Sequence, residues 1–133
     1  MLYHISPNVI EVLQPRVPSN FFTDRGYEDN STCRVSFAHS IDCCTMALGC
    51  NAVDKVYNVY TPIEESIEYY SPTVEEVPDC IITGEVWVTK PVKVKKLGVI
   101  RITSCIDEET YLFHYGDKTE RAYKFKWFWV SEG

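Results

Sequence analysis

Three residues with chemically useful side chains each lie on the polar face of a short strand-like segment. Side chains alternate across a strand, so every second residue shares one face. This alternation selects one histidine, one serine and one glutamate: His4 in residues 2–6, Ser36 in residues 34–38 and Glu85 in residues 81–89. An imidazole, a hydroxyl and a carboxylate together supply hydrogen-bond donors, acceptors and a negative charge. If the three strands are neighbours, these side chains could line one cleft.

The same pattern has a simpler interpretation, because half-buried strands carry polar residues on their solvent-exposed face. Glu85 favours the cleft slightly, since it follows Gly84 and shares a face with Thr83 and Trp87 in a segment rich in Val, Ile and Thr. A carboxylate beside an indole often marks a cleft, and it can equally lie at a solvated edge. The sequence therefore leaves both a shared site and three unrelated wet faces open.

The elements that must position these residues are mainly strands. Aromatic residues make up 14% of the chain, and they favour strands together with the abundant β-branched residues. A chain of 133 residues usually forms one domain, so we expect residues 1–133 to be a single domain. The pattern predicts seven or eight strands: residues 2–6, 34–38, 53–61 and 81–89, one or two within 92–103, and a hairpin of 111–115 and 121–130 around Gly116-Asp117.

Helices are expected to be few and short. Ser40 is typical of an N-cap, Asp42 lies in the first turn, and an apolar stripe through residues 41–48 predicts a helix that Gly49 ends. Three further segments connect the elements: residues 9–13 as a helical turn or an extended piece, residues 14–32 as a long loop, and residues 64–77 as an acidic connection. The predicted fold class is α+β, with mostly antiparallel sheets and one or two short helices.

Three short patches resemble the motifs of a known family. Leu2-Tyr3-His4-Ile5-Ser6 is similar to the L-Y-H-G-T or L-Y-H-x-S first strand of ADP-ribosyltransferases of the H-Y-E and H-S-E kind and of the related RNA 2′-phosphotransferases. Arg34-Val35-Ser36-Phe37-Ala38, followed by the Ser-capped helix, resembles their second motif, and Gly84-Glu85-Val86-Trp87 resembles the late strand with the catalytic Glu. The resemblance covers roughly the first ninety residues, in the order of that fold.

The resemblance implies an ADP-ribosyltransferase-like fold that binds NAD as a substrate and transfers ADP-ribose to an acceptor, without a metal. His4, Ser36 and Glu85 would be the catalytic residues. His4 would hydrogen-bond the adenosine ribose and Ser36 would brace the nicotinamide ribose. Glu85 would hold the 2′-hydroxyl of that ribose and stabilise its oxocarbenium-like charge. The resemblance also implies NAD contacts from an aromatic that stacks on nicotinamide, Tyr57 or Tyr60, and from pyrophosphate-binding arginines, among Arg16, Arg25 and Arg34.

The sequence departs from the family pattern at each motif. Ile5 stands where a Gly is usual, and Ser36-Phe37 replaces the usual Ser-Thr-Ser or Tyr versions. Thr83 stands two residues before Glu85, where the family has a second Glu or Gln. A Thr there puts protein targets such as arginine in doubt. The departures leave open a fold that binds a nucleotide without transferring anything, and the arginines can equally be surface loop residues.

Charge and composition exclude several classes of function. The net charge is −6, which argues against sequence-independent nucleic-acid binding and against an anionic membrane surface. The basic strip of Lys90, Lys93, Lys95 and Lys96 alternates with valines, so we interpret it as the wet face of a strand. The chain shows no secretion signal and no apolar run long enough for a membrane span, which predicts a cytoplasmic protein.

The six cysteines are expected to be free thiols, because no secretion signal accompanies them. Cys33, His39, Cys43, Cys44 and Cys50 cluster in the sequence, but no C-x-x-C spacing occurs, so we expect no zinc site. At the C-terminal end Tyr123, Phe125, Trp127 and Trp129 alternate with lysines. Aromatics beside lysines could stack bases, but a core strand with one wet face is the favoured interpretation.

A second class of function is an interaction protein without chemistry. A small acidic domain with a Pro-rich loop and a tyrosine-rich acidic stretch, residues 64–70, could bind and block a basic protein partner. The two classes differ in a structural expectation. NAD binding requires His4, Ser36 and Glu85 around one concave pocket, whereas their dispersal favours the interaction protein.

Overall fold

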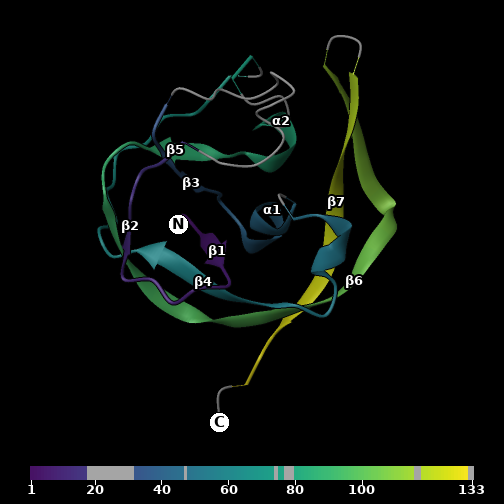
Figure 1. Ribbon diagram of the computed structural model, residues 1–133, viewed down its shortest axis with the longest axis horizontal. Helices are drawn as coiled ribbons and strands as arrows, with labels where there is room; N and C mark the ends of the chain where they lie inside the picture. The colour runs from purple at the N-terminus through teal and green to yellow at the C-terminus, as the bar shows by residue number, and fades with distance from the viewer. Residues whose placement is uncertain (18–31, 47, 74, 77–79, 116–117, 132–133) are drawn as a thin grey trace.

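The regular secondary structure of the protein consists mostly of antiparallel strands in the computed structural model (Figure 1). The structure describes residues 1–17, 32–46, 48–73, 75–76, 80–115 and 118–131. One sheet has the order β1-β4-β6-β2, with β7 also paired to β6, and a second sheet pairs β3 with β5. The expectation of an α+β fold dominated by antiparallel sheet is therefore confirmed at this level.

The larger sheet is assembled around one very long strand, β6 (Val92–Tyr115). One edge of β6 pairs with β4 (Val56–Pro62), and β4 in turn pairs with the short β1 (His4–Ser6). β6 also pairs with β2 (Val12–Leu13) near its start and with β7 (Lys118–Trp129) over its second half. In Figure 1 the β6–β7 ribbon extends away from the other strands, which curve around β1 and β3. The predicted hairpin between the last two segments is confirmed, although one strand replaces the separate strands expected from 92 to 115.

The smaller sheet of β3 (Val35–Phe37) and β5 (Val86–Val88) is joined to the larger one by two bridges. Tyr3, before β1, pairs with Ala38, and Arg16, after β2, pairs with Arg34. Each bridge consists of two backbone hydrogen bonds of 2.8–3.1 Å. Both bridges use the same edge of β3, because residues 34 and 38 have the same parity and their backbone groups face one side.

Two hydrophobic clusters occupy opposite faces of the β1–β4 pair. The first includes Leu2, Tyr60, Phe37 and Val88, and draws on β2, β3, β5 and the start of β6. The second includes Val59, Ile100, Ile102, Phe125 and Ile41, and it lies between the sheet and the first helix. Both faces are therefore buried, which explains why β4 carries four consecutive buried residues. On β7, Phe125 is buried and Lys126 is exposed, as a core strand with one wet face predicts, but Trp129, on the same face as Phe125, is 47% exposed.

The helical segments are short. α1 (Ile41–Thr45) begins at the predicted N-cap, where the Ser40 Oγ accepts a hydrogen bond from the Cys43 N–H at 3.1 Å. The helix ends at Thr45, three residues before the predicted end at Leu48, and the one-turn 3-10 helix η2 (Cys50–Ala52) follows. The Trp127 Nε1–H donates to the Asp42 carboxylate at 2.7 Å and connects α1 to β7. No described helix is long and apolar enough to cross a membrane.

The strand predicted over residues 81–89 is wrong in its first half. Residues Cys80–Thr83 form the one-turn helix α2, and β5 begins only at Val86. Gly84 separates them with a φ of +63°, a conformation that glycine adopts easily and that a continuous strand does not contain. The expected loop of residues 14–32 lies mostly outside the described residues, since residues 18–31 are not described.

Candidate functional site

The structure brings β1 and β3, which carry His4 and Ser36, next to one another. The Tyr3–Ala38 bridge places β1 beside β3. The Nδ1 atom of His4 lies 2.9 Å from the carbonyl oxygen of Ser36. A carbonyl only accepts, so Nδ1 carries the proton and donates it, which leaves Nε2 with its lone pair when the ring is neutral.

This hydrogen bond gives the Ser36 carbonyl a donor at a point where no neighbouring strand supplies one. The edge of β3 is paired at Arg34 and at Ala38, and the carbonyl of Ser36 lies between these two bridges. β1 turns away from β3 after Tyr3 to pair with β4, so the His4 ring supplies the donor that a neighbouring strand would otherwise supply. The ring also meets Phe37 edge-on, with 5.9 Å between the ring centroids. The role of His4 in this contact is structural.

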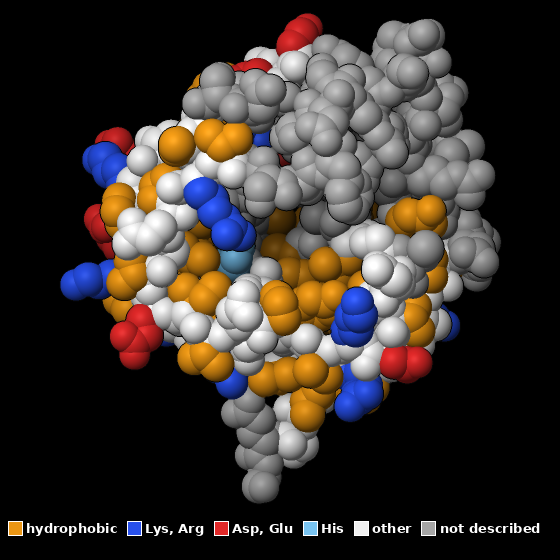
Figure 2. Space-filling view, in the orientation of Figure 1, with side chains coloured by type: hydrophobic (Ala, Val, Ile, Leu, Met, Phe, Trp, Pro, Cys, Tyr) orange, Lys and Arg blue, Asp and Glu red, His pale blue; other side chains and the backbone are white. Residues whose placement is uncertain are grey.

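The protonation of His4 follows from this environment. Burial lowers the pKa of His4, the hydrogen bond to the Ser36 carbonyl opposes that shift, and the positive charge of Arg16 adds a smaller lowering effect. The folded protein therefore favours the neutral imidazole. Figure 2 shows that hydrophobic side chains gather across the middle of one face of the molecule, with most of the Lys and Arg side chains around them.

Acidification should therefore destabilise the protein through His4. Because the folded state has the lower pKa, stability is full above the ordinary histidine value of about 6.5 and declines as the pH falls below it. We expect His4→Gln, whose amide can still donate to the Ser36 carbonyl, to lose less stability than wild type between pH 7.5 and pH 5. Urea denaturation at the two pH values measures this, with the exposed His39→Gln as control. An unchanged pH dependence in His4→Gln would contradict the assignment.

The side chains of His4 and Ser36 do not face one cleft. His4 lies opposite Tyr60 in the β1–β4 ladder and contacts Phe37, so it points toward the first hydrophobic cluster. Ser36 lies opposite Trp87, on the other face of β3 from Val35 and Phe37, which belong to that cluster. The expectation of a shared cleft is therefore wrong for this pair, because the two strands meet through a side chain and a backbone carbonyl.

Glu85 lies at the turn before β5 and is half-buried. Its backbone N–H donates to the Thr83 Oγ1 at 3.2 Å, and no described contact joins its carboxylate to His4 or Ser36. The face that it was expected to share with Thr83 and Trp87 is not solvated, since Thr83 is 5% exposed and Trp87 is 1% exposed. The simpler interpretation, a wet face on this strand, therefore does not hold, because the Trp87 ring packs against the Arg34 guanidinium and the Tyr70 ring.

The predicted pyrophosphate arginines have different environments. Arg34 is buried, its guanidinium lies 3.9 Å from the centroid of the Trp87 ring, and its Nη1 donates to the Thr32 carbonyl at 3.3 Å. Arg16 is exposed and close enough to His4 to influence its protonation. Arg25 lies outside the described residues. Arg34 therefore helps to hold β3 and β5 together, and only Arg16 of these two presents its charge to solvent.

The two predicted nicotinamide-stacking tyrosines also separate. Tyr57 is half-buried in the second cluster, and burial raises its pKa. Tyr60 is 1% exposed, and its hydroxyl donates to the Asn8 carbonyl at 2.7 Å and accepts from the Ile10 N–H at 3.0 Å. Tyr60 therefore fastens the connection between β1 and β2, and its ring is covered by core residues rather than open to a ligand.

Tyr60→Phe should lower the free energy of unfolding by about 1–3 kcal/mol. The substitution keeps the ring in the core and removes only the hydroxyl, so the half-buried Ile10 N–H loses its acceptor and the Asn8 carbonyl keeps only the Asn58 amide as a donor. Chemical denaturation followed by circular dichroism measures the loss, and Tyr69→Phe is the matched control because Tyr69 is 49% exposed. Equal stability of Tyr60→Phe and wild type would rule out this role.

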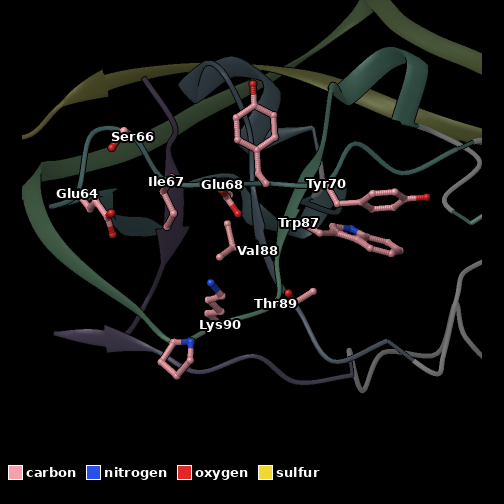
Figure 3. A pocket seen from close by; sticks show the side chains of 11 residues that line it. Glu64, Ser66, Ile67, Glu68, Tyr70, Trp87, Val88, Thr89 and Lys90 are labelled. Carbon is pink, nitrogen blue, oxygen red and sulfur yellow. The ribbon is translucent and has the colours of Figure 1, made fainter.

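A groove of about 470 Å³ lies elsewhere, between the acidic connection and the turn from β5 to β6 (Figure 3). The first wall is formed by residues 64 and 66–70, and the second by residues 87–91. Glu64 and Glu68 extend their carboxylates into the groove from the first wall, and the Lys90 ammonium faces them from the second. Ile67 and Val88 lie between these charges and make this part of the groove apolar.

One end of the groove is closed by an aromatic pair. Tyr70 and Trp87 have ring centroids 5.8 Å apart at an interplanar angle of 45°, and their backbones pair with each other. Tyr69 and Tyr70 remain about half exposed. The sequence indicates the acidic, tyrosine-rich stretch, but nothing in the local pattern shows that β5 lies against it. The groove was therefore missed as a structural site, although its residues were noted.

Five cysteines of the described part of the chain are free thiols. Cys33, Cys43, Cys44, Cys80 and Cys105 form no disulfide with one another or with another described cysteine. Burial raises the pKa of Cys44 to about 12, the neighbouring Cys43 adds to the shift, and the thiol donates to the Tyr3 carbonyl at 3.3 Å. Such a thiol is not a nucleophile at neutral pH. Among the described residues, no three His, Cys, Asp or Glu side chains are grouped to bind a metal.

Comparisons with known proteins suggest no function for this chain. A function must therefore be inferred from the groove and the His4–Ser36 contact. No protein-family model, no curated protein and no solved structure matches this chain.

Proposed function

We propose that this protein is a non-catalytic interaction protein that binds a basic segment of a partner protein in its acidic groove. The observation that carries the proposal is the position of Glu64 and Glu68, whose carboxylates extend over an apolar surface made by Ile67 and Val88. A lysine or arginine side chain matches this surface, because it has an apolar stem and a charged head.

The rim of the groove supports the same class of ligand. Tyr69 and Tyr70 also line the groove, and both are about half exposed. An aromatic face attracts a guanidinium or ammonium group, and tyrosine and arginine are both enriched in protein interfaces. The net charge of −6 adds a long-range attraction, which increases the rate of encounter with a basic partner.

The separation of the predicted catalytic residues also favours an interaction protein. An NAD site would need His4, Ser36 and Glu85 around one pocket, whereas His4 points into the first cluster and Ser36 lies opposite Trp87. The described groove is lined by none of these three residues. Binding of a basic segment in the groove requires no reacting group.

The test is titration of the protein with a hexa-arginine peptide, followed by isothermal calorimetry. We expect binding at 50 mM salt that weakens strongly at 500 mM salt, because exposed charges are screened. A hexa-glutamate peptide is the control and should not bind. The proposal fails if hexa-arginine gives no heat at millimolar concentration, or if the two peptides bind equally well.

A second candidate is ADP-ribosyltransferase-like NAD binding, and one observation favours it: β1, β3 and β5 lie next to one another, as a site shared by their residues requires. Under this candidate the cofactor would have to reach His4 and Glu85 from different sides of β3. Calorimetric titration with NAD, together with an assay for nicotinamide release, tests it. Absence of both signals at millimolar NAD rejects this candidate and leaves the first unaffected.

A further inference from the structure

The acidic groove begins where a strand pairing stops. Tyr70 and Trp87 form an antiparallel bridge, with N–H to carbonyl distances of 2.8 Å from Tyr70 to Trp87 and 2.7 Å in the reverse direction. In an antiparallel ladder the next hydrogen-bonded pair lies two residues further along each segment. That pair would join Glu68 to Thr89.

The pair of Glu68 and Thr89 is not formed. Neither residue lies in a strand or a bridge, and both line the groove instead. By the alternation of the ladder, the backbone N–H and C=O of Thr89 continue the edge that Trp87 offers to Tyr70. The groove therefore exposes a short unpaired strand edge, and unpaired edges readily accept an extended chain.

The charges on the two walls determine how such a chain would orient its side chains. Glu64 and Glu68 attract a cation on the first wall, whereas Lys90 repels one on the second. Side chains of an extended segment point alternately to opposite sides. A segment that alternates basic and apolar residues places its cations beside the carboxylates and its apolar side chains toward Val88.

We propose that the partner segment binds as a short added β-strand, with its backbone paired to the edge at Thr89 and its basic side chains beside Glu64 and Glu68. This inference rests on the proposed function and specifies the class of ligand: an extended peptide with alternating basic and apolar residues. Main-chain hydrogen bonds contribute affinity in this mode, and the side-chain pockets contribute specificity. Pro91 limits the paired edge to a short stretch, because proline has no N–H to donate.

The test compares two substitutions at Thr89 against the blocked peptide acetyl-(Arg-Val)₃-amide. Thr89→Pro removes the backbone N–H, and Thr89→Ala removes the side chain but keeps the N–H. Thr89 is exposed and follows β5, so neither change disturbs the core. We expect Thr89→Pro to weaken binding about tenfold, as the loss of one or two backbone hydrogen bonds would, and Thr89→Ala to bind within about twofold of wild type.

The outcomes separate this inference from the proposed function. If wild type binds and Thr89→Pro binds equally well, or if both variants lose affinity alike, the added strand is refuted while the groove still binds. If wild type binds hexa-arginine but not this peptide, the added strand is refuted; if it binds neither peptide, the proposed function itself fails. If Thr89→Pro does not fold, hydrogen exchange on wild type decides: saturating peptide should slow exchange of the Thr89 amide about tenfold, and unchanged exchange refutes the inference.

Discussion

Trp87→Ala should lower the free energy of unfolding by about 3–5 kcal/mol, the cost typical of removing a fully buried tryptophan. Trp87 is 1% exposed and lies between the Arg34 guanidinium, 3.9 Å from its ring centroid, and the Tyr70 ring. Its backbone pairs with Ser36 on one side and with Tyr70 on the other. Alanine would leave a large cavity and would also remove the aromatic surface that covers the buried charge of Arg34.

Urea denaturation followed by far-ultraviolet circular dichroism measures this loss. The matched control is Trp129→Ala, since Trp129 is 47% exposed at the end of β7, where it packs on Gly98 and Trp127. The control removes an equal number of atoms and should cost much less, because most of its side chain is already near solvent. Similar losses in the two variants would show that Trp87 is not the centre of the β3–β5 packing.

The double variant Glu64→Gln, Glu68→Gln should bind the hexa-arginine peptide about tenfold more weakly than wild type. Each exposed ion pair contributes roughly 0.2–1 kcal/mol, and about 1.4 kcal/mol corresponds to a tenfold change in affinity. The substitutions keep the size and shape of both side chains, and both residues are exposed, so stability should change little. The expected loss therefore reflects the charges and not the fold.

The chain supplies a closely matched control for this experiment. Glu65 lies in the same acidic run and is also exposed, but it does not line the groove. Glu65→Gln removes one charge of the same sign a single residue away, and it should bind the peptide almost as wild type does. If Glu65→Gln weakens binding as much as Glu64→Gln or Glu68→Gln alone, the attraction is due to net charge and the groove is not the site.

Local patterns in the sequence predicted most strand segments and the start of α1. Alternating valines and lysines near residue 93 predicted a strand with a wet face, and Val92 and Val94 are buried while Lys93 and Lys95 are exposed. Ser40 was identified as an N-cap, because its hydroxyl satisfies a helix N–H that has no partner within the helix. These features depend on neighbours in the chain, and neighbours are what a sequence displays directly.

Local patterns failed where a distant segment decides which side of an element is buried. Alternation placed His4, Ser36 and Glu85 on faces that it could only label polar. His4 points inward because β4 lies beside it, and Trp87 is covered in part by the ring of Tyr70, which lies seventeen residues earlier in the chain. The prediction of a strand over residues 81–89 was wrong for a different reason. The alternation of polar and apolar residues is the same whether Gly84 is extended or has a positive φ.

The sequence by itself determined the strand-rich composition, the acidic charge, the capped helix and the positions of the acidic and tyrosine-rich residues. Only the tertiary structure decided which of these residues meet. The groove exists because residues 66–68 separate from residues 88–91 beyond the Tyr70–Trp87 bridge, and the His4–Ser36 contact exists because β1 leaves the edge of β3 after Tyr3. The groove and the His4–Ser36 contact each lie where two paired segments separate. Long-range packing determines where they separate, and the residues at the site do not.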